Sequence, residues 1–206
     1  MAKNLHDKVI LILGGTGGIG SAIGDVLENA GARVCRHGRR GDFAADVREE
    51  KNIEALVEKI VQEFGRIDII VNSLTSSIKL ARLEERSWSG FLDQFNVQLK
   101  STVDILKYAV PQMKKQGGGK FVNIISSVVH GVPPKMYADY ITSKYAMFGL
   151  SKCMAEELKR YNIETKWVSP EFVKTDLTKV FPEKILEMIP IQTAEEVAGE
   201  VLKLVQ

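Results

Sequence analysis

Short apolar runs alternate with longer amphipathic segments along this chain. The run Lys8–Leu13 is continuous and rich in β-branched residues, as expected of a strand buried on both faces of a parallel sheet. The pattern predicts strands over 8–13, 32–36, 67–72, within 117–127 and over 163–169. Apolar positions at helical spacing predict helices over 19–29, 49–65, 87–116, 138–161 and 193–205.

Strand and helix follow each other throughout, which predicts an α/β fold built on an open, parallel sheet. A chain of 206 residues is long enough to bury a core without disulfides or a structural metal. No repeat, low-complexity segment or linker interrupts the pattern, so we expect residues 1–206 to form one domain.

Composition narrows the class of protein. The net charge of +2 favours neither nucleic acid nor an acidic membrane as a partner. Cys35 and Cys153 are predicted to be reduced, buried thiols. The lack of a long apolar run predicts no membrane-spanning helix, and the polar start of the chain does not read as a signal peptide. We therefore expect a cytoplasmic protein.

The stretch "GGTGGIG" (14–20) follows the first buried strand and opens a helix, which is the context of a dinucleotide-binding turn. In that interpretation Gly14 permits the tight turn, Gly18 lets the backbone approach a pyrophosphate, and Gly20 allows close packing. The spacing fits both GxxxGxG and GxxGxxG, and the alternative is a tight turn without a ligand.

A second set of residues points to proton-transfer chemistry. Ser127 follows a predicted strand, Tyr140 comes thirteen residues later, and Lys144 follows four after that. Tyr140 and Lys144 share one helical face, and an ammonium beside a phenol is expected to lower the pKa of the phenol. Ser127 can hydrogen-bond a substrate carbonyl. The alternative for the Tyr–Lys pair alone is a solvated helix face.

These two motifs are part of a longer series that follows one order along the chain. They are "GGTGGIG" (14–20), "ADV" (45–47), "DIIVNS" (68–73), "FNVQLKST" (95–102), Ser127, Tyr140, Lys144 and "SPEFVKT" (169–175). In this the chain resembles the compact, single-domain branch of the short-chain dehydrogenase/reductase superfamily over nearly its whole length. Its 3-oxoacyl-carrier-protein reductases and carbonyl reductases look most similar.

The resemblance implies a Rossmann-like fold, a nicotinamide cofactor and roles for individual residues. Tyr140 would be the acid/base, Ser127 would orient the carbonyl, and Lys144 would lower the tyrosine pKa and bind the nicotinamide ribose. Asn96 would hold a water in a proton relay. The resemblance implies that Asp46 and Val47 contact the adenine, and that Val173 and Thr175 lie beside the carboxamide. The other implied cofactor contacts are Gly14, Thr16, Gly18, Ile19, Gly20, Asn72, Tyr140, Lys144 and Pro170.

The form of the nicotinamide cofactor depends on the end of the second strand. An acidic residue there would bind the ribose diol of NAD, whereas this chain reads "RHGRR". Arg39 aligns with the arginine that meets the 2′-phosphate in NADP-using relatives, and a guanidinium suits phosphate. We therefore expect NADP(H) as cofactor, the alternative being a solvated basic run.

The chain departs from the family pattern in two lengths and two motifs. Only "GRRGDFAA" separates the second strand from Asp46, too little for a full parallel crossover. We therefore expect the family's third strand and its helix to be missing. The chain also stops at Gln206 after the last predicted helix, so we expect the family's last strand to be missing too. The result would be a doubly wound sheet of five strands ordered 2-1-3-4-5. "NSLT" (72–75) and Glu171 replace glycine-containing family motifs, so Leu74, Thr75 and Glu171 are expected to crowd the cofactor or substrate.

Histidines suggest two other kinds of site. His130 follows Ser127 by three residues, but "IISSVV" is not the G-x-S-x-G turn of a serine hydrolase, so we assign His130 to a loop. His6 and His37 lack metal-ligating neighbours, and we expect no metal.

The segment 178–190 is expected to close the substrate pocket. Its apolar residues Phe181, Ile185, Leu186 and Met188 predict a small amphipathic lid helix over an apolar pocket. The resemblance also implies a homodimer through the two long central helices, with the usual tetramer disfavoured.

Together these observations lead to the hypothesis of an NADP(H)-dependent carbonyl reductase or alcohol dehydrogenase. Hydride would pass between the nicotinamide and a carbonyl carbon, with Tyr140 handling the proton. Two alternatives stay open: an NADP-binding sensor or scaffold without turnover, and an NAD-dependent sugar or polyol dehydrogenase.

Overall fold

The computed structural model describes residues 5–41, 43–186 and 189–206. Its centre is a parallel sheet with the strand order β3-β2-β1-β4-β5-β6. The strands are β1 (Val9–Leu13), β2 (Arg33–Gly38), β3 (Phe43–Ala44), β4 (Ile69–Asn72), β5 (Gly119–Ile124) and β6 (Ile163–Val168). This is the doubly wound, Rossmann-like architecture that the alternation of strand and helix predicted.

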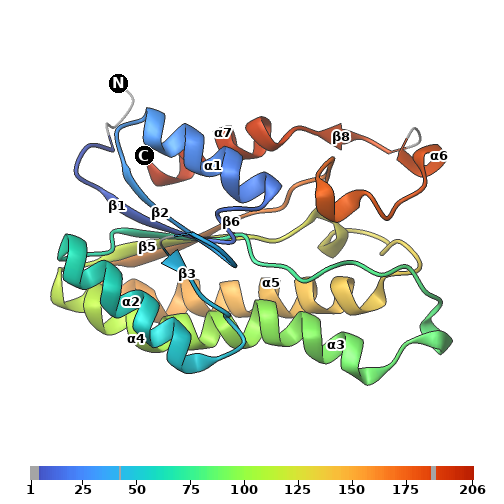
Figure 1. The fold of residues 1–206 in the computed structure, drawn as a ribbon, viewed down its shortest axis with the longest axis horizontal. Coiled ribbons are helices and arrows are strands. Elements are labelled where there is room, and N and C mark those ends of the chain that lie inside the picture. The colour runs from blue at the N-terminus through green and yellow to red at the C-terminus, as the bar shows by residue number, and fades with distance from the viewer. Residues whose placement is uncertain (1–4, 42, 187–188) are drawn as a thin grey trace.

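Helices cover both faces of the sheet (Figure 1). One face carries α1 (Gly18–Asn29) and α7 (Ala194–Val205), and the other carries α2 (Glu50–Phe64), α4 (Ser101–Lys115) and α5 (Ala138–Leu158). Strand β1 lies between the two layers and is fully buried. Its residues alternate between two cores, so Leu11 packs on the α2–α4 side and Ile12 on the α1–α7 side.

The edge of the sheet differs from the five-strand prediction. The short strand β3 pairs in parallel with β2, with His37 opposite Phe43 and Gly38 opposite Ala44. Only two residues of each strand pair, so a short loop is long enough to return the chain to the start of β3, and no crossover helix is required. The expectation that the third strand is missing was therefore wrong, although the described chain has no helix between β2 and β3.

The predicted helix over 87–116 consists of three consecutive helical segments. Helix α3 (Trp88–Phe95) leads into a π-helix over Asn96–Lys100, which continues into α4. Pro111 lies inside α4 without ending it. The wider π turn begins at Asn96, and such turns are frequent at functional sites.

The segment between β6 and α7 folds over one end of the sheet. It contains strand β7 (Phe172–Val173), a 3-10 turn over Asp176–Thr178, helix α6 (Glu183–Leu186) and strand β8 (Ile191–Gln192). Strands β7 and β8 form a separate parallel pair, which the sequence pattern did not predict. The lid helix expected here is α6, while Met188 lies outside the described residues.

The two cysteines have different surroundings. Both are free, and Cys35 on β2 is buried, where burial raises the pKa of its thiol to about 12. Cys153 is exposed on α5, so the prediction that both thiols are buried was wrong for this residue. The reason is its position on the helix, between the buried residues Ser151 and Met154 but on the opposite face. No helix in the described ranges is long and apolar enough to cross a bilayer.

Candidate active site

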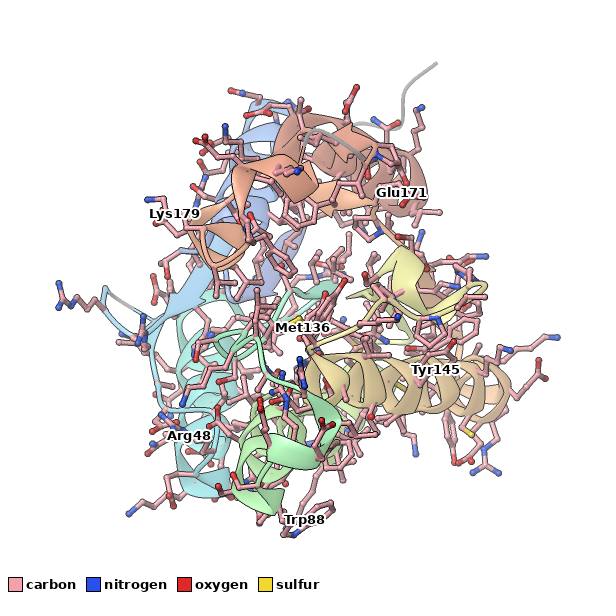
Figure 2. The ribbon with its side chains drawn as sticks, turned by 90° about the vertical axis from the view of Figure 1, so that its right-hand side faces the viewer. Arg48, Trp88, Met136, Tyr145, Glu171 and Lys179 are labelled. Carbon is pink, nitrogen blue, oxygen red and sulfur yellow. The ribbon has the colours of Figure 1, made fainter. Side chains whose placement is uncertain are left out.

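The loops at the carboxyl ends of the parallel strands meet on one side of the molecule (Figure 2). In that view Met136 lies between the segment that carries Glu171 and Lys179 and the helices that carry Trp88 and Tyr145. The crevice outside the carboxyl ends of the strands is where open α/β sheets bind ligands. The expected site residues lie on these loops or on the helices that follow them.

The glycine turn after β1 is tightly packed. Gly14 has a φ of +76°, in the left-handed region that favours glycine. A Cβ on Gly20 would lie 2.2 Å from the Gly14 carbonyl oxygen, and one on Gly18 would lie 2.6 Å from Cγ2 of Thr175. A Cβ on Gly17 would meet its first neighbour at an ordinary 3.4 Å. The packing therefore favours GxxxGxG, through Gly14, Gly18 and Gly20, over GxxGxxG.

Helix α1 starts at this turn with free backbone donors. Its N-cap residue Gly17 has no side chain to bond the N–H groups of the first turn. Unsatisfied N–H groups at a helix N-terminus make an anion-binding position. The close approach of Gly18 and Thr175 also brings the segment after β7 against the turn. The turn thus fits a pyrophosphate, with Thr175 beside it.

His37 at the end of β2 fixes the glycine turn to the sheet edge. Its Nδ1 accepts a hydrogen bond from the Gly14 N–H at 3.2 Å, and its Nε2 lies 3.0 Å from the Ala45 carbonyl oxygen. Burial lowers the pKa of His37, which favours the neutral ring. A neutral ring with its proton on Nε2 satisfies both contacts. His37 therefore has a structural role that the sequence did not indicate.

The three arginines of "RHGRR" are not equivalent. The Arg36 guanidinium is bound to α1 through Asp25 and Glu28, each at 2.8 Å. Arg39 and Arg40 are exposed. Arg39 therefore stays available for the ligand phosphate that the resemblance implies, whereas Arg36 does not.

Asp46, Val47 and Asn72, which the resemblance implies as cofactor contacts, occupy different environments. Asp46 is exposed and its carboxylate accepts hydrogen bonds from the N–H and Nε of Arg48. The Val47 side chain is buried in the core on the α2–α4 side of the sheet. Only its backbone is then left to contact a ligand. Asn72 is also buried, and its amide donates to Thr102 at 2.8 Å and accepts from the Leu74 N–H at 3.1 Å.

Two side chains of the altered motif "NSLT" have partners within the protein. The Leu74 side chain is 8% exposed and packs in the core on the α2–α4 side. The Thr75 hydroxyl donates to the carbonyl of Ser76 and accepts from Gln98. The Leu74 side chain therefore points into the core, and the effect of "NSLT" on a bound cofactor stays a prediction.

Tyr140 and Lys144 stand one turn apart on α5, as predicted. The Ser126 hydroxyl lies close enough to the Tyr140 phenol to act against the rise in its pKa. Lys144 is buried, its Nζ donates to the Ile124 carbonyl at 3.0 Å and lies 5.6 Å from the centroid of the Tyr140 ring. Strand β5 ends at Ile124, so the lysine joins α5 to the end of the strand that the two serines follow.

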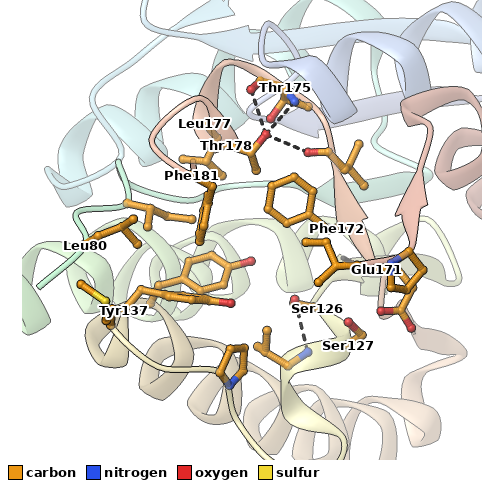
Figure 3. Close-up of a pocket in the computed structure, with 18 of the residues that line it drawn as sticks. Leu80, Ser126, Ser127, Tyr137, Glu171, Phe172, Thr175, Leu177, Thr178 and Phe181 are labelled. Atoms are coloured by element: carbon orange, nitrogen blue, oxygen red, sulfur yellow. Dashed lines mark hydrogen bonds between the residues drawn. The ribbon is translucent and has the colours of Figure 1, made fainter. Parts of the chain in front are cut away.

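Two adjacent serines line the cavity next to Tyr140 (Figure 3). The sequence singled out Ser127, whose N–H donates to the Pro170 carbonyl at 2.8 Å. Ser127 lies on the Glu171 side in the close-up. Ser126 lines the same cavity and acts on the pKa of Tyr140, and sequence spacing did not select it. The role of Ser127 stays a prediction.

Burial dominates the protonation of the Tyr–Lys pair. It raises the pKa of Tyr140 to about 12, against the lowering effect of the Ser126 hydrogen bond, and lowers the pKa of Lys144 to about 7. Desolvation disfavours the charged forms of both groups, and the lowering of the tyrosine pKa by Lys144 stays a prediction. The phenol is protonated at neutral pH.

Asn96 is half-buried at the start of the π-helix, and its relay role stays a prediction. Two residues further on, the Gln98 amide donates to Gln94 at 2.7 Å and to Ser143 at 2.8 Å. Ser143 precedes Lys144 on α5, so the Gln98 side chain links the π-helix to α5. The sequence gave no indication of this contact, because amide residues on a helix are usually solvated.

The cavity beside Tyr140 has a volume of about 470 Å³ and largely apolar walls. Tyr137, Phe172 and Phe181 pack edge to face across it, with ring centroids 5.2 and 5.3 Å apart. Phe181 from the expected lid segment is buried in this contact. Further lining residues are Ile19, Ile78, Leu80, Met136, Glu171, Val173, Thr175, Leu177 and Ile189. The cavity suits an apolar substrate, with the Glu171 carboxylate as an acidic group in its wall.

The depressed pKa of Lys144 predicts a pH-dependent stability. Between pH 7 and 10.5 the unfolded chain binds a proton that folded Lys144 has lost, so the free energy of unfolding should rise with pH in that window. Relative to Lys144→Met, wild type should gain up to about 1.4 kcal/mol per pH unit. Urea unfolding at several pH values measures this. The exposed Lys51→Met is the control, and a pH-independent difference for Lys144→Met would contradict the prediction.

Comparison with known proteins gives the family. Residues 14–206 match the sequence model of the family described as enoyl-(acyl carrier protein) reductase. A 3-oxoacyl-[acyl-carrier-protein] reductase, FabG, from Thermotoga maritima is 33% identical over 97% of this chain and 91% of its own length. Carbonyl reductase family member 4 from Xenopus laevis is 32% identical over the same shares. The chain therefore belongs to the short-chain dehydrogenase/reductase family of nicotinamide-dependent oxidoreductases.

Solved structures support the same fold. The 3-ketoacyl-(acyl-carrier-protein) reductase from Brucella melitensis, complexed with NADH, gives a TM-score of 0.89 at 24% identity, covering 98% of this chain and 92% of that one. A short-chain type dehydrogenase/reductase from Mycobacterium ulcerans gives 0.90 at 21% identity, covering 98% and 84%. At these identities the likeness concerns the fold alone.

Proposed function

We propose that this chain is an NADP(H)-dependent oxidoreductase that transfers a hydride between the nicotinamide and the carbonyl or hydroxyl carbon of an apolar substrate. The observation that carries the proposal is the meeting of Tyr140, Lys144 and Ser126 at an apolar cavity beside the glycine turn. The activities in the names of two relatives, a 3-oxoacyl-carrier-protein reductase and a carbonyl reductase, support the same reaction type.

The residues of the crevice fit a dinucleotide. Side chains are excluded at Gly14, Gly18 and Gly20, which leaves backbone N–H groups of the turn for a pyrophosphate. Exposed Arg39 at the end of β2 suits a ribose phosphate. The bound cofactor supplies or accepts the hydride, and Val173 and Thr175 line the cavity where the nicotinamide would lie.

The proton is handled by Tyr140. Because its pKa lies well above neutrality, the phenol is protonated and can donate to the oxygen of a substrate carbonyl during reduction. The hydroxyls of Ser126 and Ser127, which line the cavity beside the phenol, are placed to orient the same oxygen. In its protonated form, about half of the population near pH 7, Lys144 favours the phenolate that proton donation leaves behind. In the oxidative direction the phenolate takes the proton from the alcohol.

The cofactor form is tested by titrating the protein with NADPH and NADH and following nicotinamide fluorescence. NADPH should bind at least about tenfold tighter, a difference of ~1.4 kcal/mol, because Arg39 pairs with the 2′-phosphate. Arg39→Ala should remove this preference. Arg40→Ala, which deletes the neighbouring exposed arginine, is the matched control and should retain most of it.

A preference for NADH would instead favour the NAD-dependent sugar or polyol dehydrogenase. The apolar walls of the cavity weigh against a sugar substrate, since a polyol needs hydrogen-bonding partners for each hydroxyl. Failure of both nucleotides to bind in the micromolar range would contradict the proposal as a whole.

The alternative of a sensor or scaffold without turnover rested mainly on "NSLT" and the shortened sheet edge. The inward packing of Leu74 weighs against it, because that side chain points into the core. NADPH oxidation with a panel of apolar ketones and 3-oxoacyl thioesters tests turnover directly. Tight NADPH binding without turnover of any of them would favour the sensor.

The proposal extends to a cytoplasmic homodimer. Support comes from exposed apolar residues on the helical layer formed by α3, α4 and α5, namely Trp88, Leu92, Val103 and Tyr145. A patch of this kind on one layer is typical of a protein–protein contact. The pairing of the two long central helices that the family resemblance implies would cover it.

A further inference from the structure

A buried ion pair joins the catalytic helix to the opposite wall of the cavity. Arg86 follows a 3-10 turn over Leu83–Glu85, and Asp139 is the residue immediately before Tyr140 on α5. Their side chains are only 6% and 7% exposed, and Arg86 Nη1 donates to Asp139 Oδ2. A pair of charges removed from water to this extent requires close partners on both sides.

Arg86 also binds two backbone carbonyls of the cavity wall. Its Nη2 donates to the carbonyls of Lys79 and Met136. The Met136 carbonyl accepts a second bond from the Ala81 N–H at 2.9 Å. Met136 has a φ of +77°, a conformation that non-glycine residues adopt only when their surroundings hold them there. One guanidinium thus connects three segments that are distant in sequence.

Each of these segments contributes to the site. Ile78 and Leu80 flank Lys79 and line the cavity, as do Met136 and Tyr137. Tyr137 in turn makes the aromatic contact with the lid residue Phe181. The position of the two walls relative to each other therefore depends on the carbonyls that Arg86 holds.

Asp139 acts on the other side of the pair. Its Oδ1 accepts a hydrogen bond from the Tyr140 N–H at 2.8 Å, within the first turn of α5. Its Oδ2 would lie 3.2 Å from a Cβ on Gly90 of α3, so the carboxylate is also enclosed by that helix. The carboxylate that pairs with Arg86 thus bonds the backbone of the catalytic residue itself.

We propose that Arg86 and Asp139 are positioning residues, which hold the 78–81 wall, the Met136–Tyr137 wall and the backbone of Tyr140 in one arrangement. This inference rests on the proposed function, because it assigns a catalytic consequence to the pair. Without the guanidinium fork, the two walls and the first turn of α5 are free to move relative to each other. A displacement of about 1 Å at a reacting group can lower the rate 100-fold.

The first test uses Arg86→Lys, which keeps the charge opposite Asp139 but cannot reach both carbonyls and the carboxylate together. We expect NADPH affinity within about twofold of wild type, a kcat/KM for the best ketone about 10- to 100-fold lower, and a raised KM. Asp139→Asn should lower kcat more than it raises KM, since its contact is with Tyr140. Arg66→Lys alters an ion pair with Asp68 at the start of β4 and is the matched control.

A readout independent of turnover separates this inference from the proposed function. Hydrogen exchange of the Ala81 amide, bonded to Met136, should become faster in Arg86→Lys, while amides of the central strand β5 keep wild-type protection. If wild type proves inactive on every ketone, the proposed function fails, and this exchange measurement still decides whether Arg86 holds the walls.

Leaving one charge buried alone can prevent folding, so a second variant removes both. Arg86→Gln/Asp139→Asn leaves no unpaired charge, and should fold while losing kcat/KM and Ala81 protection as Arg86→Lys does. Wild-type kcat/KM together with unchanged Ala81 exchange in a folded variant would overturn the inference. So would a loss of activity that only follows a lower melting temperature and disappears on cooling, because the pair would then have a structural role alone.

Discussion

Tyr140→Phe should lower kcat by about 10²- to 10⁴-fold while leaving NADPH affinity within about twofold of wild type. The substitution removes only the phenolic oxygen, so the ring keeps its place on α5 and the glycine turn is untouched. Proton transfer to the substrate oxygen is then left to water. Steady-state kinetics with the best ketone, together with a fluorescence titration of NADPH, measure the two quantities separately.

The two serines provide the comparison within this experiment. Both serines line the cavity, and Ser126 is the one that acts on the pKa of Tyr140. Ser126→Ala should therefore lower kcat more than Ser127→Ala does. A kcat of Tyr140→Phe within tenfold of wild type would contradict the assignment of Tyr140 as proton donor, whatever the kcat values of the two serine variants.

The parts of the fold that the sequence predicted are those that depend on residues close together in the chain. The continuous apolar run at β1 and the glycines after it follow from residues adjacent in the chain. Tyr140 and Lys144 meet because helical spacing alone brings them to one face. Chain length between β2 and Asp46 likewise indicated the loss of a helix, but not that two residues at Phe43–Ala44 would still pair.

The features that escaped prediction depend on tertiary surroundings. Whether Ser126 or Ser127 faces the tyrosine is decided by the backbone at the end of β5, which residue spacing does not record. The pKa values of Tyr140 and Lys144 follow from burial, which the pairing of the two residues does not reveal. Arg86 and Asp139 are separated by 53 positions, and in sequence each looks like a solvated charge.

Gly20→Ala should lower NADPH affinity at least about tenfold and the free energy of unfolding by about 1–3 kcal/mol. Its Cβ would lie 2.2 Å from the Gly14 carbonyl oxygen and 3.0 Å from the Gly15 Cα. Both are backbone atoms, so no side-chain rotation relieves the overlap. The turn and the start of α1 must separate, which moves the N–H groups that would bind the pyrophosphate.

Gly17→Ala is the matched control, one turn away in the same motif. Gly17 has an ordinary φ of −83°, and a Cβ there would meet its first neighbour at 3.4 Å. Alanine is a poorer N-cap than glycine, so a loss of less than about 1 kcal/mol in unfolding free energy is expected. Urea unfolding and NADPH titration of both variants compare them. Equal losses of NADPH affinity would mean that the GxxGxxG spacing describes this turn, since the GxxxGxG spacing gives Gly17 no contact that alanine would break.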